Sequence, residues 1–236
     1  MGQKKLIRFA AIKEFSNVVE YPENMAGQWS GFFARAQPLT LELACGKGEY
    51  AVGLGRLHPE KNFLGVDVKG NRIYVGAKTA LQEGLDNVGF MRTQIDRIDQ
   101  YFAPGEVNEI WLTFPDPQLR YSRAKKRLTH PNFLRKYQQF LQPGGLIHLK
   151  TDSPLLYHFT CMVSEHYGGT MVTQYNDVYS QATEPELLNI KTHYEGLDIA
   201  QSGKIHYVCF RLPAEIKKEL DASFAEKVRE KEFKPE

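Results

Sequence analysis

Residues 39–48 read Leu-Thr-Leu-Glu-Leu-Ala-Cys-Gly-Lys-Gly, an apolar run followed by a turn that carries two glycines. The run predicts a buried β-strand, and the glycines let the backbone approach a ligand closely before a helix begins. An ordinary tight connection between a strand and a helix would look similar. The spacing of Gly46, Gly48 and Ala51 also satisfies the G-x-G-x-x-G/A dinucleotide pattern. The turn alone therefore leaves the cofactor open.

Further apolar runs recur along the chain, each short and bounded by Gly, Pro or Asp. Amphipathic helical patterns lie between them at residues 71–83 and 131–142, and Gly144-Gly145 is expected to end the second helix. Strands that alternate with helices predict an α/β fold with a parallel sheet, covered on both faces and binding ligands at the carboxyl ends of its strands. The expected strands are residues 39–43, 63–66, 88–91, 110–114, 146–149, 170–175 and 205–211.

A single domain, residues 1–236, is the expected organisation, because α/β folds of this length often form one core. Residues 1–38 form a basic arm without a clear period, which we expect to pack on the edge of the domain. Residues 39–212 carry the regular pattern of the core. Residues 213–236 mix acids and bases on a helical pattern, which predicts a solvated terminal helix.

The composition excludes several classes of protein. The three cysteines, Cys45, Cys161 and Cys209, are widely spaced without a C-x-x-C pair, so neither a disulfide framework nor a zinc site is expected. The histidines also lack the spacing of metal ligands, and no metal is expected. No stretch reaches the roughly 18 apolar residues of a membrane span, and the basic N-terminus has no apolar segment of signal-peptide length. These features predict a cytoplasmic protein without a membrane partner.

The strongest charge asymmetry lies in residues 117–150, which hold eight lysines and arginines and no acid, although the net charge of the chain is only +2. Immediately before this segment stands Phe114-Pro115-Asp116-Pro117, which places a carboxylate between two prolines after an apolar run. Phosphate backbones select clustered Lys and Arg side chains. A fixed acid beside such a cluster suggests a site that does chemistry on a polyanion.

Two acids near the glycine turn narrow the choice of small molecule. Asp67 ends the second expected strand 21 residues after Gly46, at the position that hydrogen-bonds ribose hydroxyls in such folds, and it suits either a dinucleotide or another nucleoside. Glu42 would place an anion near a pyrophosphate, whereas a nucleoside with a sulfonium and an ammonium group would be stabilised by it. S-adenosylmethionine carries these groups. A satisfied buried acid is the other interpretation of Glu42.

Short motifs follow one another in a fixed order: Leu41-Glu42 with the Gly46/Gly48 turn, Phe114-Pro115-Asp116-Pro117, Lys125-Lys126-Arg127-Leu128, Pro143-Gly144-Gly145, Lys150-Thr151-Asp152 and Thr192-His193-Tyr194-Glu195. This set resembles the bacterial tRNA (guanine-N7-)-methyltransferase family over about residues 39–212. The resemblance implies a class I methyltransferase fold, which is a Rossmann-like, doubly wound sheet of seven mostly parallel strands. It also implies S-adenosylmethionine as methyl donor and N7 of a guanine in the tRNA variable loop as acceptor.

The resemblance implies roles for individual residues, carried over position by position. Cofactor contacts are implied for Glu42, Gly46, Gly48, Asp67 and Asp116. Substrate contacts are implied for Arg120, Asp152, Thr192, His193, Tyr194 and Glu195. The implied RNA-facing run consists of Ser122, Arg123, Lys125, Lys126 and Arg127.

The chain departs from the family pattern at several places. Gln118 stands where the family usually has tryptophan, Arg120 stands where it has lysine, and Ala44 replaces the first glycine of the turn. The third acid of the family's cofactor site falls on Gln94. A carboxamide oxygen can still accept a hydrogen bond from an adenine amino group, and Asp96, two residues further on, is the alternative cofactor contact.

The implied reaction depends on alignment and not on proton removal, because guanine N7 already carries a free lone pair and the product ring gains positive charge. Asp116 and Asp152 are the expected catalytic residues, since carboxylates near the ring would stabilise this charge and accept hydrogen bonds from the guanine. Glu195 is expected to assist. The competing interpretation of Asp152 is a helix N-cap ahead of Leu155, and that of the basic run is a solvated helix start.

The leading interpretation is an RNA methyltransferase that binds tRNA as a monomer or homodimer. Ala44, Gln94 and Gln118 could instead mark a non-catalytic RNA-binding protein on a methyltransferase scaffold. Asp116-Pro117 is also similar to the D-P-P-aromatic element of exocyclic-amine methyltransferases, although the aromatic residue is absent here. An NAD oxidoreductase is disfavoured, because no catalytic acid/base pair for hydride transfer stands out.

Overall fold

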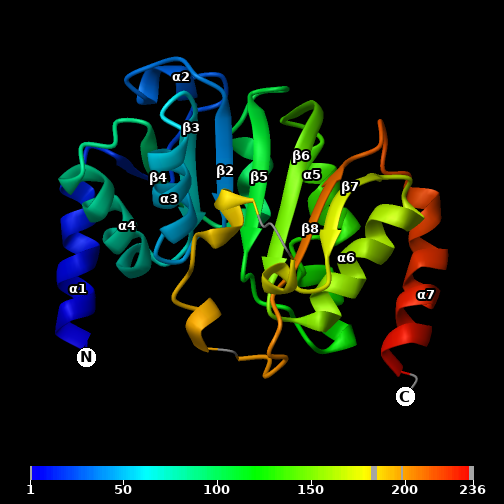
Figure 1. Cartoon of the computed structure of the whole chain (residues 1–236). Helices are drawn as coiled ribbons and strands as arrows, with labels where there is room; N and C mark the ends of the chain where they lie inside the picture. Colours follow the sequence, from blue (N-terminus) through cyan, green and yellow to red (C-terminus); the bar gives the residue numbers. More distant parts are fainter. Residues whose placement is uncertain (1, 182–184, 198, 234–236) are drawn as a thin grey trace.

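The computed structural model of the chain describes residues 2–181, 185–197 and 199–233. Its centre is an eight-stranded sheet in the order β1-β4-β3-β2-β5-β6-β8-β7 (Figure 1). The expected doubly wound, mostly parallel architecture is confirmed. The strands are β1 (Val18–Glu20), β2 (Leu39–Leu43), β3 (Asn62–Asp67), β4 (Val88–Arg92), β5 (Val107–Thr113), β6 (Leu141–Thr151), β7 (Thr170–Tyr175) and β8 (His206–Arg211).

Helices and short 3₁₀ segments surround the sheet and link its strands. The α-helices are α1 (Gly2–Ala11), α2 (Trp29–Phe32), α3 (Glu49–Leu57), α4 (Gly70–Gln82), α5 (Pro131–Tyr137), α6 (Pro154–His166) and α7 (Asp221–Phe233). The 3₁₀ segments are η1 (Ile12–Glu14), η2 (Ile95–Gln100), η3 (Tyr121–Lys126), η4 (Val178–Ser180), η5 (Glu186–Asn189), η6 (Glu195–Leu197) and η7 (Lys218–Leu220). The two ends of the chain lie at opposite sides of the molecule (Figure 1).

The strand order reverses at β2. From β2 the chain proceeds outwards through β3 and β4, and it then returns to add β5 and β6 on the other side of β2. The loops that follow β2 and β5 therefore diverge, which is where open α/β sheets bind ligands. β8 pairs antiparallel with both β6 and β7, and the other strand pairs are parallel.

Alternation of side chains along the strands decides which residues face each helical layer. Leu41 and Leu43 of β2 join a core cluster that also contains residues of α5, α6 and α7. Glu42 lies between them in sequence and points to the opposite face, where α3 and α4 contribute to a second cluster. In β5, Leu112 belongs to the first cluster and Trp111 to the second. The acid of the first motif is therefore buried beneath α3.

The N-terminal arm contributes a strand that the sequence analysis did not predict. β1 pairs in parallel with β4 at the edge of the sheet, with Val18 opposite Phe90. The implied count of seven strands is therefore too low by one. α1 packs on α4, consistent with the expectation that the arm lies at the domain edge (Figure 1).

The helix expected at residues 131–142 is shorter than predicted. α5 ends at Tyr137, and β6 begins at Leu141, which pairs with Val107 of β5. The prediction that Gly144-Gly145 ends the helix is wrong, because both glycines lie inside β6. A Cβ at Gly145 would lie only 2.9 Å from the backbone oxygen of Asn108, so this part of the strand has no room for a side chain.

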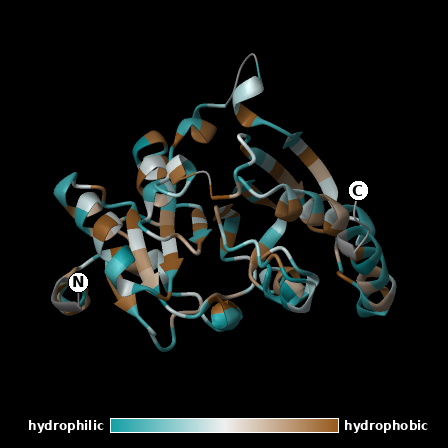
Figure 2. Cartoon of the chain, turned by 90° about the horizontal axis from the view of Figure 1, so that it is seen from below, coloured by the Kyte–Doolittle hydropathy of each residue, from teal (hydrophilic) through white to brown (hydrophobic). Residues whose placement is uncertain are grey.

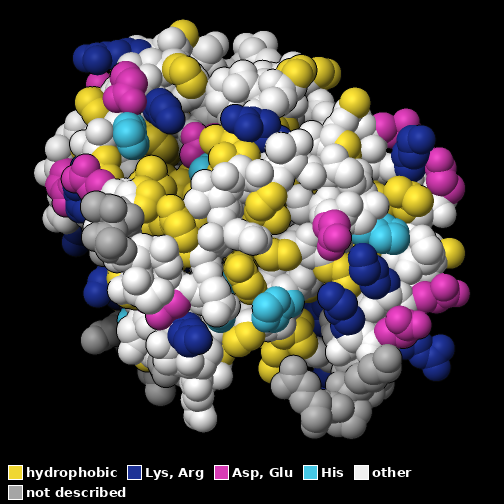
Figure 3. Space-filling view, turned by 45° about the vertical axis from the view of Figure 1, so that its right-hand side comes forward, with side chains coloured by type: hydrophobic (Ala, Val, Ile, Leu, Met, Phe, Trp, Pro, Cys, Tyr) yellow, Lys and Arg dark blue, Asp and Glu magenta, His cyan; other side chains and the backbone are white. Residues whose placement is uncertain are grey.

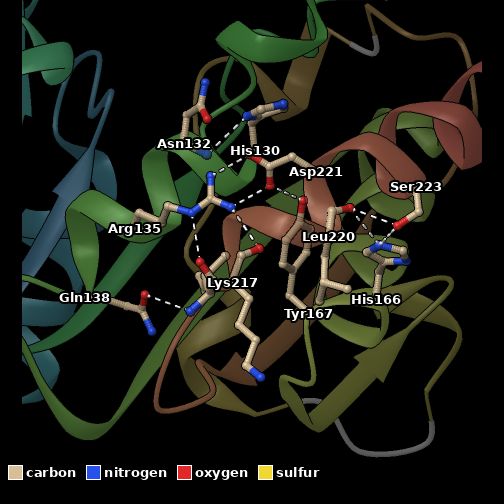
Figure 4. Close-up of polar contacts among 11 residues, drawn as sticks. His130, Asn132, Arg135, Gln138, His166, Tyr167, Lys217, Leu220, Asp221 and Ser223 are labelled. Carbon is tan, nitrogen blue, oxygen red and sulfur yellow. Dashed lines mark hydrogen bonds and ion pairs between the residues drawn. The ribbon is translucent and has the colours of Figure 1, made fainter.

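The C-terminal helix is packed and not simply solvated. Phe224 and Val228 of α7 are buried in the same core cluster as α5 and α6. Arg135 of α5 forms two hydrogen bonds with Asp221, at 3.1 and 2.5 Å, and the hydroxyl of Tyr167 donates a third to Asp221 (Figure 4). The prediction of a solvated helix is therefore wrong for this face of α7. Residues 234–236 of the expected tail lie outside the described residues.

The outer surface carries charges of both signs. On the face shown in Figure 3, Lys and Arg side chains are interspersed with Asp and Glu, and hydrophobic side chains lie between them. Among the described residues, no helix has the length and the apolar composition needed to cross a membrane.

Candidate active site

The carboxyl ends of the parallel strands lie at the edge of the sheet that Figure 2 shows from below. A cavity of about 600 Å³ lies at this edge, next to the point where the strand order reverses. The loops that follow β2, β3, β4 and β5 all contribute to its wall. Its lining includes Ala44, Asp67, Gln94, Asp96, Asp116 and Lys126. The structure thus brings together residues from four separate sequence motifs around one space.

The turn after β2 needs its glycines for two different reasons. Gly48 has a φ of 72°, and a Cβ there would lie 2.4 Å from the ring of Phe90. Gly46 has a φ of 57°, and its N–H donates a hydrogen bond of 3.0 Å to Asp67. Ala44, which stands where the family usually has glycine, also has a positive φ of 59°. A residue with a side chain in this conformation costs about 1–3 kcal/mol, so local strain is built into the cavity wall.

The carboxylate of Asp67 accepts hydrogen bonds from backbone N–H groups of two different loops. One of its oxygens accepts from Gly46 and the other accepts from the N–H of Lys69 at 2.8 Å. The side chain is buried, and each carboxylate oxygen still has a second lone pair that could accept from a ligand hydroxyl. This geometry is compatible with the predicted contact to a ribose.

Glu42 lies behind the cavity and is 3% exposed. Its oxygens accept hydrogen bonds from the N–H of Ala51 at 2.8 Å and from the hydroxyl of Thr113 at 2.6 Å. Burial raises the pKa of Glu42 to about 8, although these two hydrogen bonds lower it. At neutral pH the carboxyl group therefore retains its proton, and the expected attraction to a cationic ligand is weaker than the sequence suggested. Glu42 connects the start of α3 to the end of β5 and does not belong to the cavity lining.

Asp116 stands at the open side of the cavity, exposed to solvent. The residues around it adopt an unusual backbone, because Phe114 and Gln118 both have a φ of 48°. The carboxylate accepts a hydrogen bond of 2.9 Å from the N–H of Gln118, which fixes the turn. Gln118 itself lines the cavity at the position where the family has an aromatic wall. Backbone strain and a fixed turn thus hold this acid at the mouth of the cavity, and its predicted contact with the guanine stays a prediction.

Asp152 lies at the end of β6, half-buried, with one oxygen accepting from the N–H of Ala200 at 3.1 Å. The helix N-cap of α6 is Ser153, whose hydroxyl accepts from Leu156 at 3.3 Å. The alternative that made Asp152 the N-cap is therefore wrong. Asp152 is not part of the cavity lining, and its predicted role in catalysis stays a prediction.

The segment between β7 and β8 passes in front of the sheet and reaches the carboxyl edge (Figure 1, yellow to orange). It carries the predicted substrate loop, in which Thr192 accepts a hydrogen bond of 3.1 Å from the N–H of Glu195. A Cβ at Gly46 would lie 3.4 Å from the ring of Tyr194, so this ring is seated on the cofactor turn. The backbone N–H of His193 donates a hydrogen bond of 3.3 Å to Glu49. The loop is thus placed next to the predicted cofactor site.

The predicted RNA-facing run corresponds to η3 and is largely exposed. Arg120, Ser122, Arg123, Lys125 and Lys126 are exposed, and Lys126 also lines the cavity beside Asp116. A second cavity of about 560 Å³ lies on the other side of η3, between this segment and α7, and its lining includes Ser122 and Lys125.

Arg127 is the exception in this run. It is fully buried, and its guanidinium donates hydrogen bonds to the backbone oxygens of Pro117 and Gln118 at 3.2 and 3.1 Å. It also lies 4.5 Å from the ring centre of Phe159. The prediction that Arg127 contacts RNA is wrong, because its charge is used inside the protein to hold the turn that carries Asp116.

Sequence comparison identifies the family. Residues 36–208 match a family described as putative methyltransferases. Over 223 residues the chain is 45% identical to the tRNA (guanine-N(7)-)-methyltransferase of Christiangramia forsetii, which covers 90% of this chain and 100% of that protein. The chain belongs to the tRNA (guanine-N(7)-)-methyltransferase family. It is a methyltransferase, and the alternatives of an NAD oxidoreductase and of a non-catalytic RNA-binding protein are not supported.

Solved structures with low sequence identity share the fold of this tRNA (guanine-N(7)-)-methyltransferase family member. The 16S rRNA methyltransferase KamB has a TM-score of 0.58 at 13% identity, covering 79% of this chain and 94% of that one. A mutant 16S rRNA (adenine(1408)-N(1))-methyltransferase from Catenulisporales acidiphilia, solved with its cosubstrate SAM, has a TM-score of 0.51 at 12% identity, covering 79% and 90%. These similarities show the methyltransferase fold.

Two residues of the site were missed from the sequence. Thr113 supplies the hydroxyl that binds Glu42, and Lys150 buries its ammonium beneath the substrate loop. Thr113 directly precedes the F-P-D-P motif, and a polar residue at the end of a buried run was the signal that could have found it. Lys150 directly follows Leu149 at the end of another buried run, where a charged side chain is equally unusual.

Proposed function

We propose that this protein transfers the methyl group of S-adenosylmethionine to N7 of a guanine in the variable loop of tRNA. The observation that carries the proposal is the cavity at the carboxyl edge, where Asp67, Asp96 and Asp116 converge in a chain of this family. The relative from Christiangramia forsetii bears the name of this activity. The family name favours N7 over an exocyclic amine as the acceptor.

The cavity residues fit the groups of S-adenosylmethionine. Asp67 has free lone pairs for the ribose hydroxyls, and Gln94 and Asp96 both line the cavity as acceptors for the adenine amino group. The glycine turn allows the backbone to approach the amino-acid part of the cofactor. The surrounding carboxylates offset the positive charge of the sulfonium.

The chain's own residues act by position and charge. When bound, S-adenosylmethionine supplies an electrophilic methyl group, and guanine N7 needs no general base. Alignment of the two reactants can lower the barrier by about 7–11 kcal/mol in favourable cases. Asp116 lies at the mouth of the cavity, where its carboxylate stabilises the charge that develops on the purine ring. Asp152 accepts hydrogen bonds from the guanine edge in this proposal.

The tRNA is held by the exposed cations of η3 and by Arg120, which directly precedes it. Arg120, Arg123 and Lys125 extend from the cavity mouth along the surface, and phosphate contacts are their role in this proposal. The Thr192–Glu195 loop, whose Tyr194 lies against the cofactor turn, contacts the substrate in this proposal. Three unpaired cysteines support a reducing, cytoplasmic setting for this reaction.

Incubation with labelled S-adenosylmethionine and unmodified tRNA tests the proposal directly. Digestion of the product should yield N7-methylguanosine from the variable loop. Label on an exocyclic amine would reassign the acceptor. Calorimetry with the cofactor alone provides the control, because cofactor binding without transfer to any tRNA would overturn the proposed substrate and leave the cofactor site in place.

A further inference from the structure

Lys150 is a fully buried lysine near the end of β6. Its ammonium donates hydrogen bonds to the backbone oxygens of Leu188 at 2.8 Å and Ile190 at 3.2 Å. It also forms an ion pair of 2.9 Å with Glu195, whose side chain is 7% exposed. The hydroxyl of Tyr179 lies 3.4 Å from the ammonium and donates a hydrogen bond to Glu195 as well. These partners all belong to the segment between β7 and β8.

The same ammonium also touches the cofactor side of the site. It lies 5.4 Å from the ring centre of Tyr50 in α3 and 5.8 Å from that of Phe114 in the F-P-D-P motif. The backbone oxygen of Lys150 accepts a hydrogen bond of 2.8 Å from the N–H of Phe114. Lys150 therefore joins the strand end that leads to Asp152, the turn that leads to Asp116 and the substrate loop.

The segment itself has little regular structure to hold its position. Its described part contains three 3₁₀ pieces of three or four residues, η4, η5 and η6, and no longer element. Such short 3₁₀ turns are weakly stable on their own, so tertiary anchors must decide where the segment lies. The buried side chains of Val178, Leu188 and Ile205 supply apolar anchors. Lys150 supplies three of the polar contacts, and the hydrogen bonds from His193 to Glu49 and from Ala200 to Asp152 add to them.

A buried ammonium specifies its surroundings more strictly than an apolar side chain does. Its desolvation is unfavourable unless its hydrogen-bond donors are satisfied in good geometry. Here two carbonyl groups and one carboxylate satisfy it, and each comes from a different point between Leu188 and Glu195. A displaced segment would remove these three hydrogen-bond acceptors from a buried charge, which makes the observed placement strongly preferred.

We propose that Lys150 is a positioning residue for methyl transfer, which holds residues 186–197 so that the Thr192–Glu195 loop is seated against the cofactor turn. This inference rests on the proposed function for the role of the loop. Glu195 is the internal partner of Lys150 in this arrangement. Tyr194, whose ring lies next to Gly46, is the part of the loop that contacts the cofactor turn.

The test compares Lys150→Met with wild type by hydrogen exchange and by steady-state kinetics. Methionine is similar in length and keeps the apolar stem without the charge. We expect faster exchange confined to residues 186–197, because the segment loses its polar anchor. The KM for tRNA should rise and kcat/KM should fall by at least about tenfold, since small misplacements of substrate-binding groups have large kinetic effects. The Kd for S-adenosylmethionine, measured by calorimetry, should change less.

A matched control is Lys61→Met, which removes another lysine with an acid partner, Glu109, at 3.5 Å. Lys61 directly precedes β3 at the opposite edge of the sheet, so this variant should keep wild-type exchange in residues 186–197 and a wild-type KM. If Lys150→Met fails to fold, Glu195→Gln carries the test. It leaves the carbonyl partners of Lys150 in place and should accelerate exchange only near η6.

Wild-type exchange in residues 186–197 of folded Lys150→Met would overturn the proposal. Uniform acceleration along the whole chain would do so too, because it would make Lys150 a general stability residue. Hydrogen exchange needs no turnover. Faster exchange confined to residues 186–197 of the variant would support the positioning contact of Lys150. Absence of methyl transfer by the wild-type protein would separately refute the proposed function.

Discussion

The hydroxyl of Thr113, at the end of β5, donates a hydrogen bond of 2.6 Å to Glu42 in the neighbouring strand β2. The second oxygen of Glu42 accepts from Ala51 in α3. One buried carboxyl group therefore connects the two strands that flank the reversal of strand order with the first helix behind the cavity. Its protonation state consequently affects the stability of the site.

Glu42 should make folding stability depend on pH. Its pKa is raised from 4.5 to about 8 by burial, so between these values the native state holds a proton that the unfolded state releases. The free energy of unfolding therefore falls as the pH rises from 4.5 to about 8. The stabilisation from this proton is fully present only below pH 4.5. One pKa unit corresponds to about 1.4 kcal/mol, so the effect is on the order of a few kcal/mol.

Glu42→Gln keeps both hydrogen bonds possible and removes the titration. Urea denaturation of the ligand-free protein at several pH values should give a flatter dependence for this variant than for wild type. Glu83→Gln, a change at an exposed surface acid, is the control and should retain the wild-type slope. Equal slopes for Glu42→Gln and wild type would show that Glu42 ionises in the native state like an exposed acid.

Asp116→Asn and Asp152→Asn should each reduce methyl transfer without loss of folding. Asp116 is exposed, and an asparagine oxygen at either position can still accept the hydrogen bond seen from Gln118 or Ala200. Only the negative charge disappears, and loss of one stabilising group of this kind typically lowers kcat by about 10²-fold or more. Single-turnover kinetics with saturating tRNA measures this step.

Asp86→Asn is the matched control for both substitutions, because it removes one exposed carboxylate ahead of β4, away from the cavity lining. It should leave the single-turnover rate unchanged. Near-wild-type rates in Asp116→Asn and Asp152→Asn would show that neither carboxylate stabilises the charged purine.

The sheet and the cofactor cavity were largely accessible from sequence. Residues 39–43 form β2 with the expected bounds, because Leu39, Leu41 and Leu43 recur at the period of a strand and face the same core cluster. The carboxyl ends of β2, β3 and β5 then converge by topology alone, which brings Ala44, Asp67 and Asp116 around one cavity. Local pattern and chain topology were sufficient for these features.

The errors arose where partners lie far apart in the chain. Leu141 continues the apolar face of a helix, but it pairs with Val107 and begins a strand, which local periodicity cannot show. Arg127 looks like its basic neighbours in sequence. Its burial depends on the carbonyl groups of Pro117 and Gln118, which a turn with a positive φ presents to it. Lys150 of β6 likewise pairs with Glu195, which lies 45 residues further along the chain, and no sequence pattern near either residue predicts this contact.

Arg127→Ala should lower the stability of the fold, whereas the double variant Arg123→Ala/Lys125→Ala should leave it nearly unchanged. Arg127→Ala removes the charged donor from the part-buried carbonyl oxygens of Pro117 and Gln118 and leaves a cavity in the core, so the free energy of unfolding should fall by on the order of 2 kcal/mol or more. The exposed pair should leave stability within about 0.5 kcal/mol of wild type. Urea denaturation checks both expectations.

The same double variant should weaken tRNA binding and reduce its salt dependence. Each lost phosphate contact lowers the slope of log K against log salt by roughly 0.7–0.9. Filter binding at several salt concentrations measures the slope. A wild-type slope for Arg123→Ala/Lys125→Ala would place the RNA path elsewhere on the surface.

The packing of α7 predicts that its buried face contributes to global stability although it lies at the end of the chain. Phe224 is 3% exposed and packs against Phe159 and Tyr167, and the Arg135–Asp221 pair fixes the start of the same helix (Figure 4). Truncation of a buried phenylalanine typically costs about 3–5 kcal/mol, because it removes apolar contacts and leaves a cavity. Phe224→Ala should therefore lower the urea midpoint of the whole domain in one cooperative transition.

Glu226→Ala, on the exposed face two residues on, should change stability by no more than about 0.5 kcal/mol. Similar small effects of both substitutions would mean that α7 detaches from the core in solution, as the sequence pattern of a solvated helix suggests.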